Sequence, residues 1–480
     1  MNKEYEIDDK IASKVKWSFA IGGLGKDMMF AMSTLMLGFF TIYVGVPVGI
    51  VGTIIMIARI WDAINDPIMG TIVDNTKSKF GKFRPWILIG TILNAIILIF
   101  VFFKPDLAPD SFWMIFYVSV FYILWGMSYT LMDIPFWSMI PTFSQSQKER
   151  ESISVLTRIF TSIGYIIISA PWLIVVTLLG GGQTRTEILH GFFLLAIIVS
   201  IVFIITQLLV CKNAKEKYTT TNEEPTTLRK MISMLKSNDQ LLVVMVTVLI
   251  FNFVLYTTSS MATFFFIFDI NRDLTYDIKY LLFLFLAIGG VFQVASLFVY
   301  PLLSKFLKRR QIFQLSIIVS IVGFFGLFIT AFFLKNNIYI LFPIGVLVFF
   351  GLGLSTILQT VMLADTVEYG EWKFGRRSES ITFSVQTFVV KLAMGLSAGV
   401  AGLGLTIFGF KGDRNVDSET FVYETQSMFT LWGIRSLMFI LPIIGLLIAL
   451  YIFRKYHILD EKKFSEVVHE LRVRKGEENA

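Results

Sequence analysis

The sequence predicts an all-α membrane protein with twelve transmembrane helices. Hydrophobic residues make up 55% of the 480 positions and charged residues only 16%, against about 25% in ordinary soluble domains. The mean hydropathy is +0.71. Stretches with few charges, near the roughly 20 residues that cross a bilayer, recur along the whole chain. This composition excludes an ordinary soluble globular protein.

The apolar stretches divide into twelve expected spans. The first six are expected near 17–44, 47–73, 85–103, 112–141, 151–179 and 187–210. The second six are expected near 239–268, 278–304, 311–334, 338–364, 380–409 and 425–453. Several of these are longer than a bilayer requires, so we expect them to be tilted or broken.

The basic residues predict the orientation. Most of the 42 Lys and Arg residues fall in the tails and in alternate loops, which the positive-inside rule assigns to the cytoplasm together with both termini. The net charge of +7 is therefore a topology signal, and we expect no nucleic-acid partner. Because Cys211 is the single cysteine, an intrachain disulfide and a cysteine-based zinc site are excluded. We expect a multi-pass protein of the cell membrane.

A long interior polar stretch divides the chain into two halves of six spans. We expect five parts: a cytoplasmic tail, a six-helix bundle, a central cytoplasmic loop, a second six-helix bundle and a cytoplasmic tail, at 1–16, 17–211, 212–237, 238–453 and 454–480. Two halves of six suggest internal duplication, which is common in secondary transporters. Apolar residues at helical spacing in the last part predict a surface helix at the inner face.

Two carboxylates lie one helical turn apart in the second span. Asp62 and Asp66 are at positions i and i+4, so they share a face of the helix and repel each other. An ionised Asp at the centre of a membrane helix costs roughly 2.5–3.5 kcal/mol on insertion scales. The pair therefore predicts a cation-binding site, with Arg59 on the same face as a structural ion-pair partner.

Spans 1 and 4 each carry charge near mid-membrane. Lys26 and Asp27 follow a glycine-rich turn, which is also compatible with close helix packing. In span 4, Asp133 is flanked by Tyr129 and Trp137 at i−4 and i+4, so the three line one face. A carboxylate between two aromatic rings suits a sugar, whose hydroxyls donate to the acid and whose C–H faces stack on the rings.

Cations in spans 5 and 11 complete the set. Arg158 lies early in span 5, where we expect it to contact sugar hydroxyls. Lys391 lies about a dozen residues into span 11 and is the only ionisable residue deep in that helix. Two compatible roles remain open for Lys391: a salt bridge that locks the two halves together, and a counter-charge that competes with the transported cation for the span 2 carboxylates.

Several sequence runs resemble the glycoside–pentoside–hexuronide:cation symporters of the major facilitator superfamily, and among them the melibiose branch. The resemblance covers Trp17 to about Tyr456, and the runs that carry it are Gly25-Lys26-Asp27, Ala58 to Gly70 around Trp61-Asp62-Ala63-Ile64-Asn65-Asp66-Pro67, Gly81-Lys82-Phe83-Arg84-Pro85-Trp86, Met132-Asp133-Ile134-Pro135-Phe136-Trp137-Ser138 and Ala364-Asp365-Thr366-Val367-Glu368-Tyr369-Gly370. It implies two pseudo-symmetric six-helix bundles that work by alternating access. We expect the monomer to be the working unit.

The resemblance also implies roles for individual residues. It assigns cation binding to Asp62, Asp66, Asn65 and Thr130. It assigns sugar binding to Lys26, Asp27, Tyr129, Asp133, Trp137 and Arg158, with Lys391 and Thr387 completing the site from the second half. Because both Asp27 and Asp133 are retained, a neutral α-galactoside such as melibiose is the expected sugar. The coupling ion is Na⁺ or, alternatively, H⁺, and no other cofactor is expected.

Three other functions compete with uptake of an α-galactoside. One is cation-coupled transport of another glycoside, a pentoside or a hexuronide. A second is a lysolipid transporter of related fold, which should have a wide apolar cavity, whereas the acids and Arg158 predict a hydrophilic one. The third is a membrane-embedded enzyme, which is disfavoured because the clustered acids are accompanied by no nucleophile–base pair, metal-ligand set or phosphate-binding loop.

Overall fold

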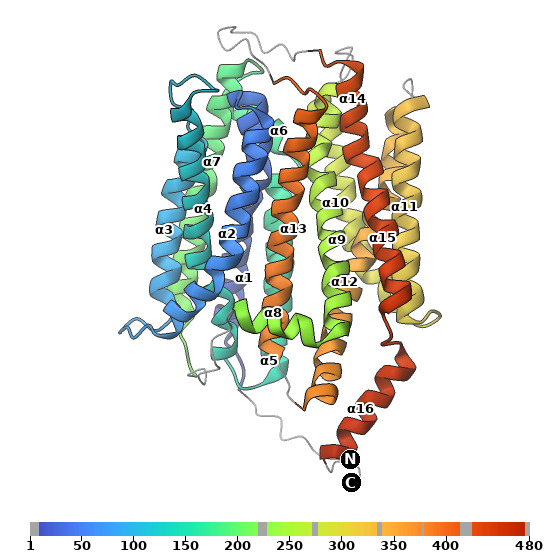
Figure 1. Cartoon of the computed structure of the whole chain (residues 1–480). Helices are drawn as coiled ribbons and strands as arrows, with labels where there is room; N and C mark the ends of the chain where they lie inside the picture. The colour runs from blue at the N-terminus through green and yellow to red at the C-terminus, as the bar shows by residue number, and fades with distance from the viewer. Residues whose placement is uncertain are drawn as a thin grey trace. The chain divides into compact units, whose positions relative to one another are not determined.

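The computed structural model describes residues 9–218, 228–270, 277–333, 338–375, 379–412 and 425–475. All of the secondary structure in these ranges is helical, and 12 of the helical segments are long and apolar enough to cross a membrane. The prediction of an all-α protein with twelve spans is thus confirmed. The chain forms two compact units, Met1–Pro225 with Phe410–Thr425, and Thr226–Gly409 with Gln426–Ala480 (Figure 1).

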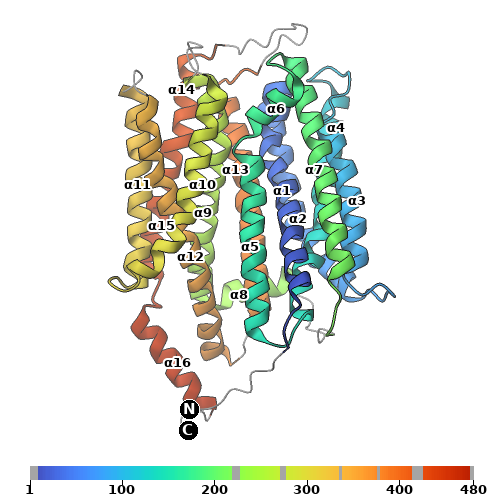
Figure 2. The same ribbon diagram turned by 180° about the vertical axis from the view of Figure 1, so that it is seen from behind.

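The first unit contains the first six spans. Its helices are α1 Ser13–Gly38 with the π-helix η1 Phe39–Val44, α2 Val48–Asp74, α3 Arg84–Val101, α4 Phe112–Ser138, the short η2 Ile140–Thr142, α5 Gln147–Ser169, α6 Trp172–Gly180 and α7 Arg185–Asn213. Figure 2 shows α1 beside α5 and α7. At the α1–α5 crossing, a Cβ on Gly164 would lie 2.2 Å from the Leu24 carbonyl oxygen, so only glycine permits this approach.

The second unit contains the last six spans and two shorter helices. Its elements are α8 Leu228–Ser237, α9 Asp239–Phe264 with η3 Phe265–Ile270, α10 Ile278–Leu303, α11 Arg309–Phe333, η4 Ile338–Ile340, α12 Leu341–Phe374, α13 Glu379–Ile407, α14 Met428–Arg435 with η5 Ser436–Ile440, α15 Leu441–Tyr456 and α16 Glu461–Lys475. The part of the chain predicted as a central polar loop therefore includes a helix, α8.

Three spans differ from the prediction. The predicted span 151–179 is divided into α5 and α6, and Pro171 lies at the break because it has no backbone N–H to continue the α5 ladder. The last span is interrupted by η5 before α15. The predicted span 338–364 continues for ten more residues to Phe374, where Gly375 takes a positive φ of 68° and ends α12.

The tail after the last span folds back onto α12. Helix α16 packs against the far end of α12 in a small apolar cluster of Tyr369, Leu459, Val467 and Leu471. The Trp372 indole donates to Glu470 at 2.6 Å. A surface helix was expected in this part of the chain, and the structure shows the helix and its partner.

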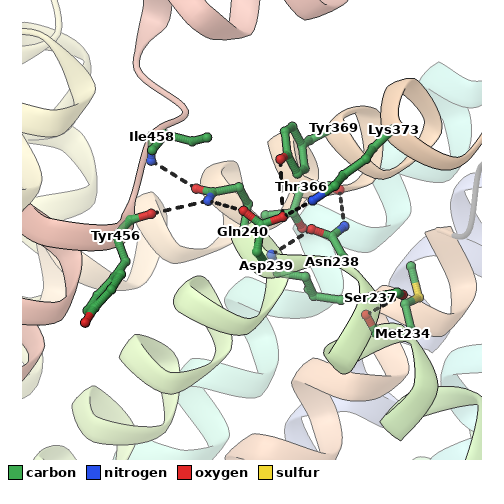
Figure 3. Close-up of polar contacts among 11 residues, drawn as sticks. Met234, Ser237, Asn238, Asp239, Gln240, Thr366, Tyr369, Lys373, Tyr456 and Ile458 are labelled. Carbon is green, nitrogen blue, oxygen red and sulfur yellow. Dashed lines mark hydrogen bonds and ion pairs between the residues drawn. The ribbon is translucent and has the colours of Figure 1, made fainter.

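Polar contacts join α9, α12 and the segment before α16 (Figure 3). Asn238 caps α9 and its amide donates to the Thr366 carbonyl at 3.1 Å. Asp239 forms an ion pair with Lys373. The Gln240 side chain donates to the Tyr456 carbonyl and accepts from the Ile458 N–H. The start of α9 is thus joined both to α12 and to the segment between α15 and α16.

Candidate functional site

The Lys26 side chain connects three acceptors from α1 and α4. Its ammonium lies 2.8 Å from Oδ1 of Asp27, 2.8 Å from Oδ1 of Asp133 and 3.1 Å from the Tyr129 hydroxyl. The contacts with Asp133 and Tyr129 are hydrogen bonds, and the contact with Asp27 is an ion pair. The Lys26 side chain is 6% exposed, whereas those of Asp27 and Asp133 are 21% and 26% exposed. One buried cation thus holds two partly accessible carboxylates, and we call this group the Lys26 cluster.

Two aromatic rings and a second cation border the Lys26 cluster. The Lys26 ammonium lies 5.3 Å from the centre of the Trp137 ring, and the Arg158 guanidinium lies 4.9 Å from the same ring. Both distances are within the range of cation–π attraction. Trp137 is half-buried and Arg158 is exposed. The structure therefore brings together six residues predicted for the sugar site: Lys26, Asp27, Tyr129, Asp133, Trp137 and Arg158.

The predicted cation site lies where α2 faces α4. One oxygen of Asp62 accepts from Arg59 at 3.1 Å, and Oδ1 of Asp66 accepts from the Thr130 hydroxyl at 3.2 Å. Asp62 is 2% exposed and Asp66 is half-buried. Thr130 is buried, and Asn65 on α2 is half-buried. We call Asp62, Asp66 and Thr130, with Arg59, the Asp62 cluster.

Arg59 is enclosed by aromatic rings. Its guanidinium lies 5.2 Å from the Trp125 ring, 5.7 Å from the Tyr122 ring and 6.0 Å from the Phe30 ring. The side chain is 4% exposed and pairs with Asp62, as the i, i+3 spacing predicts. Arg59 therefore supplies a positive charge beside Asp62, so repulsion between Asp62 and Asp66 does not by itself require a bound cation.

Gly126 on α4 leaves room for the Asp62 carboxylate. A Cβ at this position would lie 2.5 Å from Oδ1 and 2.8 Å from Oδ2 of Asp62. Tyr122, Gly126 and Thr130 follow each other at i, i+4 and i+8, so one face of α4 meets Arg59, Asp62 and Asp66 in turn. Sequence reasoning missed Gly126, although its spacing from Thr130 could have indicated it.

The two predicted residues of the second half lie on α13. Thr387 is exposed and Lys391, one turn further along, is half-buried. Both belong to the second unit, so their part in a site with the first-unit residues stays a prediction.

The acceptor atoms that Asp62, Asp66 and Thr130 present are all oxygens. Carboxylate and hydroxyl oxygens suit hard cations, whereas zinc and similar metals prefer nitrogen and sulfur. Within the described ranges, no group of three or more His, Cys, Asp or Glu residues could hold a metal ion. The fold and these two clusters define a membrane transporter with polar groups buried among its spanning helices.

Comparison with known proteins identifies the family. Residues 18–460 match the family described as MFS/sugar transport protein, and the chain belongs to this family. It is 26% identical to the uncharacterized symporter YjmB of Bacillus subtilis, covering 97% of this chain and 96% of that one. It is 28% identical to a lactose permease of Leuconostoc lactis, covering 95% and 71%. It is 27% identical to a raffinose carrier protein of Pediococcus pentosaceus, covering 88% and 64%.

Solved structures share the fold. A bacterial homolog of the human lysosomal transporter Spinster superposes with a TM-score of 0.69 at 14% identity, covering 97% of this chain and 99% of that one. The xylose transporter XylE of E. coli gives a TM-score of 0.60 at 14% identity, covering 94% and 98%. The protein is therefore a sugar symporter of the major facilitator type, a multi-pass protein of the cell membrane and not an enzyme.

Proposed function

We propose that the protein couples inward movement of Na⁺, or alternatively of H⁺, to uptake of an α-galactoside such as melibiose, with both termini in the cytoplasm. The Lys26 cluster binds the sugar and the Asp62 cluster, with Asn65, binds the cation. In the Lys26 cluster, the partly exposed carboxylates of Asp27 and Asp133 accept hydrogen bonds from sugar hydroxyls. Trp137 offers a ring for the apolar face of the sugar, and Arg158 is a further donor.

The observation that carries this proposal is that α4 contributes adjacent residues to the two clusters. Tyr129 contacts Lys26, and the next residue, Thr130, contacts Asp66. Phe30 on α1 also lies between the clusters, 5.6 Å from the Tyr129 ring and 6.0 Å from the Arg59 guanidinium. A shift of α4 when a cation binds would therefore move a sugar ligand as well.

Coupling follows from this shared helix. A cation bound by Asp62 and Asp66 stabilises the position of α4 in which Tyr129 and Asp133 bind the sugar. By thermodynamic linkage, the sugar must then raise the affinity for the cation by the same factor. Only the fully loaded or the empty carrier reorients, with Lys391 acting as the counter-charge when the cation has left and Thr387 contributing to the sugar site.

The relatives favour a galactoside. Their names include lactose permease and raffinose carrier protein, and both of these sugars contain a galactosyl unit. The isoprimeverose transporter of Lactiplantibacillus pentosus, which is 27% identical over 400 residues, keeps a xyloside as the runner-up substrate.

Counterflow in liposomes tests the proposal. Purified protein is reconstituted with a panel of galactosides, glucosides, xylosides and glucuronides, with and without Na⁺ at fixed pH. We expect the strongest exchange with an α-galactoside and a further increase with Na⁺. Exchange that responds to pH but not to Na⁺ would assign the coupling to H⁺. Exchange of glucuronides alone would overturn the galactoside assignment.

A further inference from the structure

A buried asparagine on α3 holds α4 behind the Asp62 cluster. The Asn94 side chain is fully buried, and its amide nitrogen donates to the Trp125 carbonyl and to the Ser128 hydroxyl, both at 2.8 Å. The Ser128 hydroxyl in turn donates to the Trp125 carbonyl at 3.1 Å. Because the three groups share their hydrogen bonds, α4 is fixed to α3 at this level.

The fixed part of α4 is the part that meets the Asp62 cluster from the other side. Gly126 follows Trp125 directly and lies against the Asp62 carboxylate. The Trp125 ring lies 5.2 Å from the Arg59 guanidinium. Thr130, two residues after Ser128, donates to Asp66. Asn94 therefore contacts the backbone and side chain that bracket Gly126, without touching either carboxylate.

The close approach of α3 and α4 makes this contact a sensitive one. A Cβ on Gly90, one turn before Asn94, would lie 2.7 Å from the Met132 backbone nitrogen. There is no space for a side chain at Gly90, and one turn further along α3 the Asn94 amide makes its two hydrogen bonds to α4. Groups in the layer behind metal ligands commonly control ligand orientation in this way.

We propose that Asn94 is a positioning residue of the cation site, setting the distance between the Gly126–Thr130 face of α4 and the carboxylates of Asp62 and Asp66. This inference rests on the proposed function, since it requires the Asp62 cluster to bind a cation. It predicts that loss of the Asn94 amide raises the Kd for the cation, and that this rise is not explained by a general loss of stability.

The test measures Na⁺ affinity without any sugar. Full-length protein in detergent is melted at increasing NaCl, with choline chloride keeping the ionic strength constant. The rise of Tm with Na⁺ gives the Kd, because a ligand that binds only the folded state stabilises it by mass action. Asn94→Leu, which keeps the size but removes both hydrogen bonds, should raise the Kd about 10-fold, the lower end of the effect of outer-layer substitutions on metal sites. Asn94→Ser, which keeps a polar group at this position, should raise the Kd by a smaller factor than Asn94→Leu and remains informative if Asn94→Leu does not fold.

Ser200→Ala is the matched control. The Ser200 hydroxyl is buried and donates to the Ala95 carbonyl at 3.1 Å, so it fixes the neighbouring residue of α3 to α7 instead of to α4. This variant should lower Tm without Na⁺ and leave the Kd unchanged. Equal Kd values for both Asn94 variants, Ser200→Ala and the parent would overturn the role of Asn94.

Asp62→Cys separates this inference from the proposed function. If Na⁺ stabilises the parent and not Asp62→Cys, the cation site stands and the Asn94 variants decide the inference. If Na⁺ stabilises Asp62→Cys as much as the parent, or stabilises neither, the assignment of a Na⁺ site to this cluster fails, and the role of Asn94 fails with it.

Discussion

Each unit joins its first span to its last span through a buried arginine, but the arginine has different partners in the two units. In the first unit, Arg185 of α7 donates to the Tyr43 and Val44 carbonyls of η1 at 2.9 and 3.1 Å. In the second unit, Arg435 forms a two-point ion pair with Asp269 of η3 at 2.6 and 2.7 Å. Both arginines are buried. The buried arginine is thus balanced by carbonyl dipoles in one unit and by a full negative charge in the other.

The units also differ in where their ion pairs lie along the helices. The first unit has Lys26 with Asp27 and Asp133, and Arg59 with Asp62, well inside spanning helices. Two pairs of the second unit join helix ends, Asp269–Arg435 and Asp239–Lys373, and a third, Asp365–Arg309, joins α12 to the start of α11. The first-unit pairs thus belong to the two clusters proposed to bind sugar and cation, whereas the three second-unit pairs join neighbouring elements. Two units with six spans each therefore carry different charge arrangements.

Replacing Arg435 or Arg185 should show the largest effects. Arg435→Met leaves Asp269 buried without its partner, which typically costs about 3–5 kcal/mol of folding free energy. Arg185→Met removes donors from two carbonyls and should cost less, about 1–3 kcal/mol. Thermal melting in detergent measures both losses. A larger loss of folding free energy in Arg185→Met than in Arg435→Met would contradict the difference between the two arginine contacts.

Neutralising a carboxylate of the Lys26 cluster should act on the sugar alone. Asp133→Asn removes a charged acceptor that also holds Lys26, so we expect sugar affinity to fall about 100-fold, in line with the cost of breaking a charge-assisted contact. Na⁺ binding should remain measurable, because Asp62 and Asp66 are untouched. Isothermal titration with melibiose and, separately, with NaCl checks this. Unchanged melibiose affinity would contradict the sugar assignment, whereas loss of both affinities together would indicate a folding defect instead.

Filling the space at Gly126 should act on the cation. In Gly126→Ala the new methyl group meets the Asp62 carboxylate, which must move, so we expect Na⁺ affinity to fall about 10-fold, as for other changes that reorient metal ligands. Gly70→Ala on α2 is the matched control, because a Cβ there has no neighbour within 4 Å. If the two variants bind Na⁺ equally well, the close fit between α4 and Asp62 does not matter for binding.

The smallest effect concerns pH and His457, which follows the last span. Burial lowers the pKa of His457 from 6.5 to about 4, with the charge of Arg310 acting in the same direction. Between these values the unfolded chain binds a proton that the folded one does not, so stability falls as pH falls from 6.5 towards 4, by about 1 kcal/mol between pH 7 and pH 5.5. Comparing Tm of the parent and of His457→Phe across this range measures the effect. Parallel curves would contradict it.

The first unit supplies a contrast at acidic pH. Lys217 donates to Asp9 and holds the pKa of that carboxyl well below its usual range. Its contribution to stability is therefore fully present above pH 3.8 and lost only as pH falls further, through the lowered pKa. Above pH 4, the change of stability with pH should therefore be smaller in His457→Phe than in the parent, and the same in Asp9→Asn as in the parent.

Hydropathy alone predicted the twelve spans, because the bilayer imposes length and apolarity on each helix. The end of α12 could not be predicted in this way. Beyond residue 364 the helix carries Asp365 and Glu368, and it continues because α16 and the start of α9 provide partners for its Tyr369, Trp372 and Lys373. Hydropathy does not report these tertiary contacts, so it could not predict that α12 extends to Phe374.

The sequence predicted those site residues that carry charge within a membrane helix, and those pairs that lie close together on one helix. The Arg59–Asp62 pair follows from its i, i+3 spacing within one helix. The joining of Asp27 and Asp133 by Lys26 does not, because it depends on how α1 and α4 approach each other. Asn94 carries no charge, and no sequence signal distinguished it from a packing residue, whereas Gly126 had only its spacing from Thr130 to indicate it.

The central claim is that the Asp62 cluster couples a cation to the sugar, and Asp62→Cys tests it most directly. Melibiose affinity is measured for the parent and for Asp62→Cys at fixed pH while Na⁺ replaces choline. The account predicts that Na⁺ raises the affinity of the parent severalfold and leaves that of Asp62→Cys unchanged. A rise of the same size in Asp62→Cys would contradict the claim.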